Sequence, residues 1–166
     1  VVTAVSESLK RETYANFSYN GDIQVIPNFI DFHRFNKQPK DHFKKVIAPN
    51  NEKILVHTSN FRKVKRVPDA LAIYRAVAAK IPAKLLLIGD GPDRAAVEEE
   101  CRNCEVCADV TFLGKQEAVE EILSIADLFL IPSETESFGL AALEAMACEV
   151  PVISTNTGGL PEVNID

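Results

Sequence analysis

Residues 128–154 have the sequence LFLIPSETESFGLAALEAMACEVPVIS. The four apolar residues at 128–131 predict a short buried strand, and residues 152–154 predict a second one. Between them a polar loop leads into residues 138–148, whose alanines and leucines predict a largely buried helix. Strand, loop, helix and strand in this order form the unit of a parallel sheet whose faces are covered by helices.

The same alternation extends along the chain. Ser6 suits the N-cap of the first predicted helix, and Asp69 and Asp93 place negative charge in first turns of later helices. Pro68 and Pro92 suit first-turn positions, where a backbone N–H has no partner. We therefore predict an α/β fold, a Rossmann-like parallel sheet with helices on both faces. The predicted strands cover residues 1–5, 23–26, 54–59, 85–88, 110–112, 128–131 and 152–154, and the predicted helices cover 6–17, 68–80, 92–101, 117–125 and 138–148.

Residues 36–53 interrupt this alternation. They contain Pro39, Pro49, an Asn50-Asn51 pair and several lysines, a composition that predicts a loop or linker. The linker would separate residues 1–35, a strand, helix and connection from a preceding domain, from a compact block at 54–166. The sequence begins without Met and directly in strand-like residues, which suggests a chain cut from a longer one.

Composition excludes several classes of protein. With 166 residues and 46% hydrophobic content, the chain is a globular piece and not a disordered segment. The net charge of −6 argues against general binding of nucleic acid or anionic membranes, which need a basic surface. No apolar run approaches the ~20 residues of a membrane helix, and no export signal opens the sequence. We expect a cytoplasmic protein that holds any anion locally.

Three of the four cysteines, Cys101, Cys104 and Cys107, have a metal-like spacing. An iron–sulfur or tetrahedral zinc site needs a fourth ligand nearby. Cys148 lies far downstream in a helix-like stretch, and the histidines are scattered. We therefore predict reduced structural thiols and no metal.

Three loops follow predicted strands at their carboxyl ends, over residues 59–66, 89–92 and 132–139. In an open α/β sheet, ligands bind at that edge. We expect the three loops to face one cleft.

The third loop combines a helix start with two acids. Gly139 allows close approach of backbone, and the free N–H groups of Phe138, Gly139 and Leu140 would form a site for phosphate oxygens. Glu136 and Glu144 would lie roughly 12 Å apart along a continuous helix, a span comparable with that from a sugar to a ribose across a diphosphate. The alternative is that both are solvated acids near a helix terminus. For Glu144 that is awkward, because its neighbours are apolar and a buried carboxylate needs partners. On the residues alone, both interpretations stay open.

The stretch ESFGLAALE at 136–144 resembles the E-x7-E motif of the family 4 retaining glycosyltransferases. Flanking segments match in order. VIPNFID at 25–31 resembles the family's P-N-G-V-D stretch, GDGP at 89–92 its G-x-G-P loop, FLG at 112–114 its F-L-G strand end, and PVI at 151–153 with GGLPE at 158–162 its closing motif. The resemblance covers essentially the whole chain and implies that residues 54–166 are the nucleotide-sugar-binding domain, truncated at its end, of a two-domain GT-B enzyme.

The resemblance also implies roles for single residues. Glu136 would contact the donor sugar and Glu144 the ribose hydroxyls. The family places an Arg five residues before a Lys on the diphosphate; Lys65 matches the Lys, but Asn60 stands at the Arg position, and Arg62 is the substitute we propose. The candidate catalytic residues are therefore Glu136, Lys65 and Arg62. The candidate substrate-binding residues are Asn60, Gly89, Gly91, Leu113, Gly114, Ser137, Phe138, Gly139, Leu140 and Glu144.

The basic loop SNFRKVKR at 59–66 is similar to that of the N-acetylglucosaminyl L-malate synthases of bacillithiol biosynthesis. This implies UDP-N-acetylglucosamine as donor and L-malate as acceptor, with transfer that retains the anomeric configuration. Lys65, Arg62 and the helix start would stabilise the leaving diphosphate, so neither a metal nor a cofactor is expected. Without the resemblance, the lysines form an ordinary solvated basic loop.

Other functions remain open. A nucleotide-sugar epimerase or phosphorylase can use a related frame, although the E-x7-E spacing disfavours both. The chain alone can also be a non-catalytic nucleotide-sugar-binding module, because the family's remaining catalytic groups come from an amino-terminal domain, and we expect the chain alone to be inactive. A dinucleotide dehydrogenase is disfavoured, because Arg94 replaces the third glycine of its phosphate loop. The donor, the acceptor and a homo-oligomeric state are left open.

Overall fold

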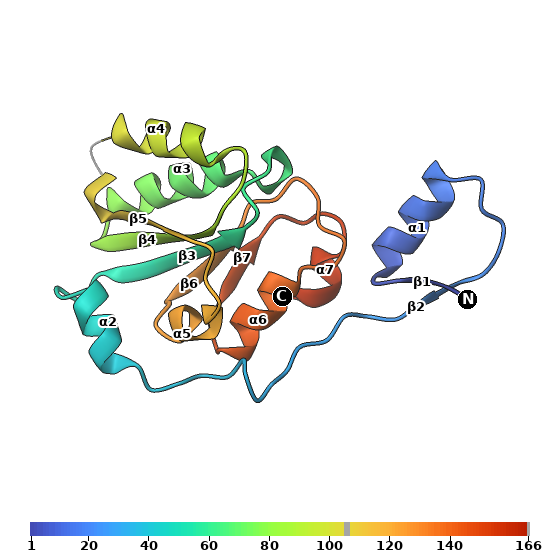
Figure 1. The fold of residues 1–166 in the computed structure, drawn as a ribbon, viewed down its shortest axis with the longest axis horizontal. Coiled ribbons are helices and arrows are strands. Elements are labelled where there is room, and N and C mark those ends of the chain that lie inside the picture. Colours follow the sequence, from blue (N-terminus) through green and yellow to red (C-terminus); the bar gives the residue numbers. More distant parts are fainter. Residues whose placement is uncertain (105–106, 166) are drawn as a thin grey trace.

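The computed structural model describes residues 1–104 and 107–165, and its main body is a single parallel sheet (Figure 1). Five strands pair in the order β5-β4-β3-β6-β7. They are β3 (Lys53–Ser59), β4 (Ala83–Gly89), β5 (Val110–Gly114), β6 (Leu128–Ile131) and β7 (Val152–Ser154). Glu105, Val106 and Asp166 lie outside the described residues, and with them part of the Cys101–Cys107 segment considered above.

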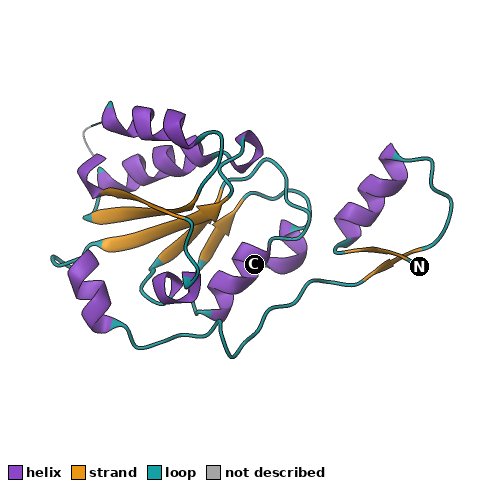
Figure 2. Ribbon diagram, in the orientation of Figure 1, coloured by secondary structure: helices purple, strands orange, loops and turns teal. Residues whose placement is uncertain are grey.

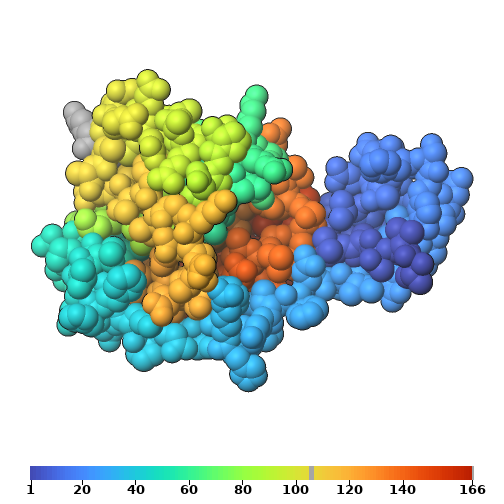
Figure 3. Space-filling model, in the orientation of Figure 1, coloured from blue at the N-terminus to red at the C-terminus, as the bar shows by residue number. Residues whose placement is uncertain are grey.

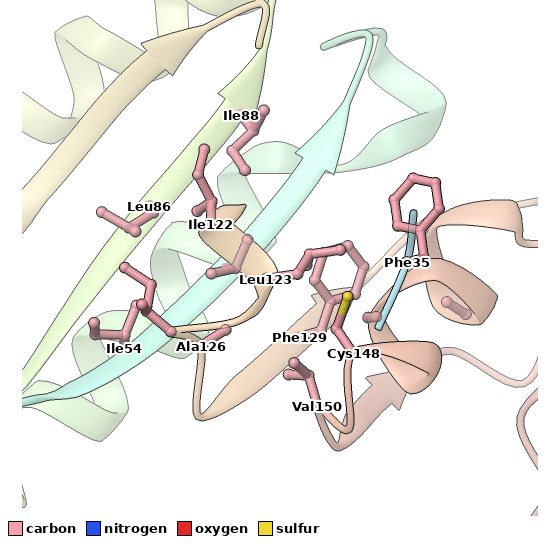
Figure 4. Packing of buried hydrophobic residues seen from close by; sticks show 14 of the residues in the cluster. Phe35, Ile54, Leu86, Ile88, Ile122, Leu123, Ala126, Phe129, Cys148 and Val150 are labelled. Carbon is pink, nitrogen blue, oxygen red and sulfur yellow. The ribbon is translucent and has the colours of Figure 1, made fainter. Parts of the chain in front are cut away.

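The two central strands are apolar over most of their length because helices cover both faces of the sheet (Figure 2). On one face, Leu55, Leu85 and Leu87 pack with α3 (Val67–Ala78) and α4 (Arg94–Arg102). On the other, Ile54, Val56 and further core residues pack with α5 (Val119–Leu123) and α6 (Leu140–Ala147). Figure 4 shows this second cluster, with Phe129 close to Cys148 and Val150. The predicted fold class, a Rossmann-like sheet with helices on both faces, is confirmed.

A small amino-terminal unit lies to one side of the main body (Figures 1 and 3). It consists of β1 (Val2–Ala4), α1 (Glu7–Asn16) and β2 (Ile23–Val25), with β1 and β2 paired in parallel in a separate sheet. As predicted, the Ser6 side chain caps α1 by accepting a hydrogen bond from the N–H of Leu9. An irregular connection then runs along the main body, where Phe35 is buried in the core.

The strand predictions are confirmed at all seven positions, with boundaries that differ by at most two residues. The five predicted helices are also present, but the last begins at Leu140, because Gly139 has φ +101° and stands outside the helix as its N-cap. None of the helices in the described ranges is long and apolar enough to cross a membrane.

Residues 36–53, predicted to be a loop, contain the helix α2 (Asp41–Ile47). The prediction of a continuous loop was wrong because Asp41 in the first turn and Lys44 and Lys45 in the last suit the helix dipole, despite the flanking prolines. A second short helix, α7 (Leu160–Val163), was not predicted. Two turns of 3-10 helix, η1 (Lys63–Lys65) and η2 (Cys107–Asp109), complete the described elements. The division into domains at 35 and 53 stays a prediction.

Candidate functional site

The three predicted loops lie together at the carboxyl edge of the sheet. They follow β3 and its two neighbours, β4 and β6, which all run parallel. The N–H of Asp93 donates to the carbonyl of Phe61 (3.0 Å), and the N–H of Glu134 donates to the carbonyl of Val64 (2.8 Å). The first loop is therefore joined by main-chain hydrogen bonds to the third loop and to the residue that follows the second, while the shared cleft stays a prediction.

Gly89 and Gly91 pack the second loop against the first. A Cβ at Gly89 would lie 1.8 Å from the carbonyl oxygen of Ser59, and one at Gly91 would lie 1.9 Å from that of Asn60. Gly89 also has φ +116°, which L side chains rarely adopt. The two glycines are thus required by close backbone packing at the site, and their role toward a ligand stays a prediction.

A buried histidine fixes the start of the first loop. His57 is 1% exposed, with Nδ1 2.9 Å from the carbonyl oxygen of Leu130 and Nε2 2.9 Å from Oγ of Ser59. Because a carbonyl only accepts, Nδ1 carries the proton and Nε2 accepts from the Ser59 hydroxyl. Ser59 Oγ in turn accepts the N–H of Phe61 (3.3 Å).

The charge state of His57 follows from its burial, which lowers its pKa to about 4; the Leu130 carbonyl opposes this shift and the nearby Lys65 charge adds to it. The imidazole is therefore neutral near neutral pH. The sequence analysis assigned no role to His57, although a single histidine within the apolar strand ILVHTS is a visible signal of a buried hydrogen bond.

Lys65 and Glu136 form an ion pair between the first and third loops. Lys65 Nζ lies 2.6 Å from Glu136 Oε1, which also accepts the hydroxyl of Ser133 at 2.9 Å. The two charged side chains are only 21% and 17% exposed. Two candidate catalytic residues, 71 positions apart in the sequence, are therefore in direct contact and partly buried.

Residues 155–159 hold the third loop through hydrogen bonds and close backbone packing. The N–H of Gly159 donates to the carbonyl of Glu136 (2.8 Å), and Oγ1 of Thr155 donates to the carbonyl of Ser133 (2.6 Å). A Cβ at Gly158 would lie 2.0 Å from the Glu136 oxygen, so this contact requires glycine. The Gly158-Gly159 pair was noted in the sequence only as part of a family motif, and its packing against the loop explains it.

The start of α6 presents unpaired backbone donors. Within the described residues, no acceptor receives the N–H groups of Phe138, Gly139 and Leu140. Phe138 is buried, which anchors the turn, while the side chain of Leu140 is exposed. The orphan N–H groups of a helix start attract anions; phosphate binding by these three groups stays a prediction.

Glu144 projects from α6 and is half-buried. Burial raises the pKa of its carboxyl, the positive charge of Arg34 opposes this, and Glu120 adds to it. Its side chain forms no hydrogen bond within the described part of the chain. Arg34 itself pairs with Glu120 (3.1 Å). Arg34 lies on the connection, more than 80 residues before both Glu120 and Glu144 in the sequence. No local signal in the sequence therefore links Arg34 to either carboxylate.

The remaining candidate residues are less closely connected. Asn60 and Arg62 are exposed and make no side-chain hydrogen bond or ion pair within the described residues, so the structure leaves both free to meet a ligand. Leu113 packs against the core, and Gly114 follows it with φ +66° at the end of β5. Ser137 is exposed and its carbonyl accepts a hydrogen bond from Ser6.

The cysteine segment lies apart from these loops, at the far end of α4. Sγ of Cys101 and Cys107 are 2.8 Å apart, and the Cys104 thiol donates to the Cys101 carbonyl (2.9 Å). Burial raises the pKa of Cys101 to about 12, which keeps its thiol protonated. Over residues 1–104 and 107–165, no group of three or more metal-ligating side chains is suitably arranged.

The family is established by comparison with known proteins. A family model described as Glycosyl transferases group 1 matches residues 38–166. The chain belongs to this family. It is 49% identical, over 164 residues and 98% of its length, to the N-acetyl-alpha-D-glucosaminyl L-malate synthase of Bacillus anthracis, of which it covers 43%. It is 32% identical over 148 residues to a D-inositol 3-phosphate glycosyltransferase of Mycolicibacterium smegmatis, covering 84% of this chain and 33% of that protein.

Solved structures share the fold of this glycosyltransferase-family chain over part of their own length. Anabaena Alr3699/HepE, solved in complex with UDP and glucose, matches all of the chain with a TM-score of 0.86 at 23% identity, over 47% of its own length. The sucrose-phosphate synthase of Thermosynechococcus elongatus matches 96% of the chain with a TM-score of 0.82 at 26% identity, over 41% of its length. The expected GT-B architecture is confirmed, and the chain spans less than half the length of these relatives.

Proposed function

We propose that the chain is the donor-binding half of a retaining glycosyltransferase that transfers N-acetylglucosamine from UDP-N-acetylglucosamine to L-malate. The choice of donor and acceptor is supported by the 49% identity to the malate synthase of Bacillus anthracis over nearly the whole chain. The single observation that carries the site is the Lys65–Glu136 pair beside the unpaired N–H groups of α6. On this proposal, a preceding domain of the same protein supplies the other half of the site.

The geometry matches the chemistry of a leaving diphosphate. As the bond from sugar to phosphate breaks, negative charge grows on the diphosphate oxygens. A cation and oriented N–H groups at fixed positions stabilise that charge more in the transition state than in the bound donor. We assign this role to Lys65, the N–H groups at the start of α6 and the exposed guanidinium of Arg62. These groups give an acidic chain of net charge −6 a local anion site.

The two glutamates of the E-x7-E stretch would bind hydroxyls at either end of the donor. Glu136 lies beside Lys65, and we assign it to the hydroxyls of the sugar next to the diphosphate. Glu144 is farther along α6, and its half-buried carboxylate has free acceptor positions within the described residues for the ribose hydroxyls. The backbone of Leu113 and Gly114, at the end of β5, would border the base.

Titration calorimetry tests donor binding with the 166-residue chain itself. We expect UDP and UDP-N-acetylglucosamine to bind, and Lys65→Glu to weaken both by at least about tenfold, because a charge-assisted contact becomes repulsive. Lys80→Glu is the matched control, since Lys80 is exposed beyond the far end of α3. Unchanged UDP affinity in Lys65→Glu would remove Lys65 from the site.

Turnover is tested with the chain joined to the preceding domain that this proposal requires. We expect release of UDP from UDP-N-acetylglucosamine only when L-malate is present, and NMR of the product should show retained anomeric configuration. Activity should survive a chelator, because no metal is assigned a role. An absolute requirement for a divalent ion would contradict this arrangement, and UDP release that does not depend on L-malate would overturn the proposed acceptor.

A further inference from the structure

The amino-terminal unit forms hydrogen bonds with the loop from Ser133 to Gly139, here called the donor loop, and with α7. Ser6, which is 1% exposed, donates from Oγ to the carbonyl of Ser137 at 2.6 Å. Beside it, the Glu162 carboxylate accepts the N–H of Glu7 on Oε2 and the N–H of Ser8 on Oε1, both at 2.8 Å. These contacts join residues more than 130 positions apart at the start of the ten-residue helix α1.

Glu162 is itself linked to the donor loop. It lies in the first turn of α7, which follows directly on the Gly158-Gly159 pair that packs against Glu136. The buried Leu160 of the same helix lies beneath Gly139, where an added Cβ would come within 2.7 Å of its side chain. The donor loop is therefore held between α7 on one side and Ser6 on the other.

A carboxylate that accepts two first-turn N–H groups is a favourable helix cap, because it satisfies orphan donors and complements the positive end of the helix dipole. Both oxygens of Glu162 are used in this way, one for each N–H group. The cap therefore fixes the position of α1 relative to α7. The Ser6 contact links the same end of α1 to the Ser137 carbonyl.

We propose that Glu162 is a positioning residue of the donor site: its carboxylate fastens α1 to α7, and the fastened unit holds the loop from Ser133 to Gly139 in the shape that binds the donor diphosphate. The coupling to the donor rests on the function proposed above. Because coupling between two equilibria is reciprocal, a bound donor should also strengthen the contact between Glu162 and α1.

Amide hydrogen exchange followed by NMR tests the contact without any ligand. Glu162→Gln removes the charge and leaves one acceptor oxygen for two N–H groups. We expect protection at Glu7 and Ser8 to fall about fivefold, the effect of a weakened helix cap. Protection should also fall at the N–H of Gly159, which reports on the donor loop through Glu136. Glu99→Gln, an exposed acid on α4, is the matched control and should change none of these amides. Unchanged protection in Glu162→Gln would overturn the proposal.

A second arm measures the coupling. UDP should raise the protection of Glu7 and Ser8 in the wild type, and Glu162→Gln should weaken UDP affinity about fivefold while leaving affinity in Glu99→Gln unchanged. Ser6→Ala should weaken UDP affinity in the same direction, since it breaks the other contact. If the wild type binds UDP and Glu162→Gln binds it equally well, the positioning role is refuted and the contact is only structural. If the wild type binds no UDP, the proposed function fails together with the donor coupling, while the exchange data alone still decide whether Glu162 holds α1.

Discussion

Replacement of His57 by glutamine should reduce the loss of unfolding free energy that occurs as the pH is lowered. The imidazole is buried and neutral, with its pKa lowered to about 4, whereas in the unfolded chain it titrates near its ordinary 6.5. Above the unfolded value both states are neutral, and the folded protein keeps its full stability. As the pH falls from 6.5 to about 4, His57 binds a proton in the unfolded chain but not in the folded protein, so the free energy of unfolding decreases.

The size of this effect follows from the two pKa values. Each pH unit between them costs about 1.4 kcal/mol of unfolding free energy, so the interval from 6.5 to about 4 amounts to roughly 3 kcal/mol. That is a large share of the 5–15 kcal/mol by which a typical domain is stable. The glutamine variant carries no titrating group at this position. Loss of the contacts to Leu130 and Ser59 lowers its stability by a constant amount, which does not alter the slope.

Urea unfolding of both proteins at a series of pH values from about 7 to about 4 provides the measurement, with linear extrapolation to water. All other ionisable groups are present in both proteins, so their contributions cancel in the difference. We expect the stability gap between wild type and His57→Gln to shrink by roughly 3 kcal/mol across the series. His33→Gln, which removes an exposed side chain, should follow the wild type. Parallel curves for wild type and His57→Gln would refute the inference that the buried imidazole is neutral.

Three further outcomes are expected at the donor loops. Gly89→Ala forces a Cβ to within 1.8 Å of the Ser59 carbonyl at φ +116°, so the urea midpoint should fall by the equivalent of at least about 2 kcal/mol; an unchanged midpoint would contradict the close packing. Arg62→Ala should weaken UDP affinity in calorimetry about tenfold while Asn60→Ala leaves it unchanged, and the opposite ranking would assign the diphosphate contact to Asn60. Because burial raises the pKa of Glu144, UDP affinity of the wild type should weaken as acid protonates this carboxyl, and Glu144→Gln should reduce that dependence; equal pH profiles would exclude Glu144 as the acceptor.

The sequence predicts best the elements whose burial is visible in the pattern of neighbouring residues. β3 and β4 each contain an apolar run, at 54–56 and 85–88, because both faces of the sheet are covered. The acid in the first turn of α3 is likewise a local signal. α2 was missed for the opposite reason. It has no buried residue, and it is flanked by prolines and asparagines that are typical of loops.

The contacts of the site also differ in how well the sequence predicts them. Parallel topology alone brings the loops after β3 and β6 together, and with them Lys65 and Glu136, because β3 and β6 are neighbours in the sheet. Other contacts join residues more than 80 positions apart: Arg34 with Glu120, Ser6 with Ser137, and Glu7 with Glu162. Nothing in their local sequence marks these contacts, since they depend on how the amino-terminal unit and its connection lie against the main body.

The close backbone contacts made by Gly89, Gly91 and Gly158 have a consequence for protein engineering. At these three positions any side chain collides with main chain, so a mutant library that randomises them would consist mostly of unfolded proteins. Asn60 and Arg62, on the first loop, have exposed side chains. On the proposed function, Asn60 can therefore be varied while the glycine framework is left intact, whereas Arg62 is kept for the diphosphate.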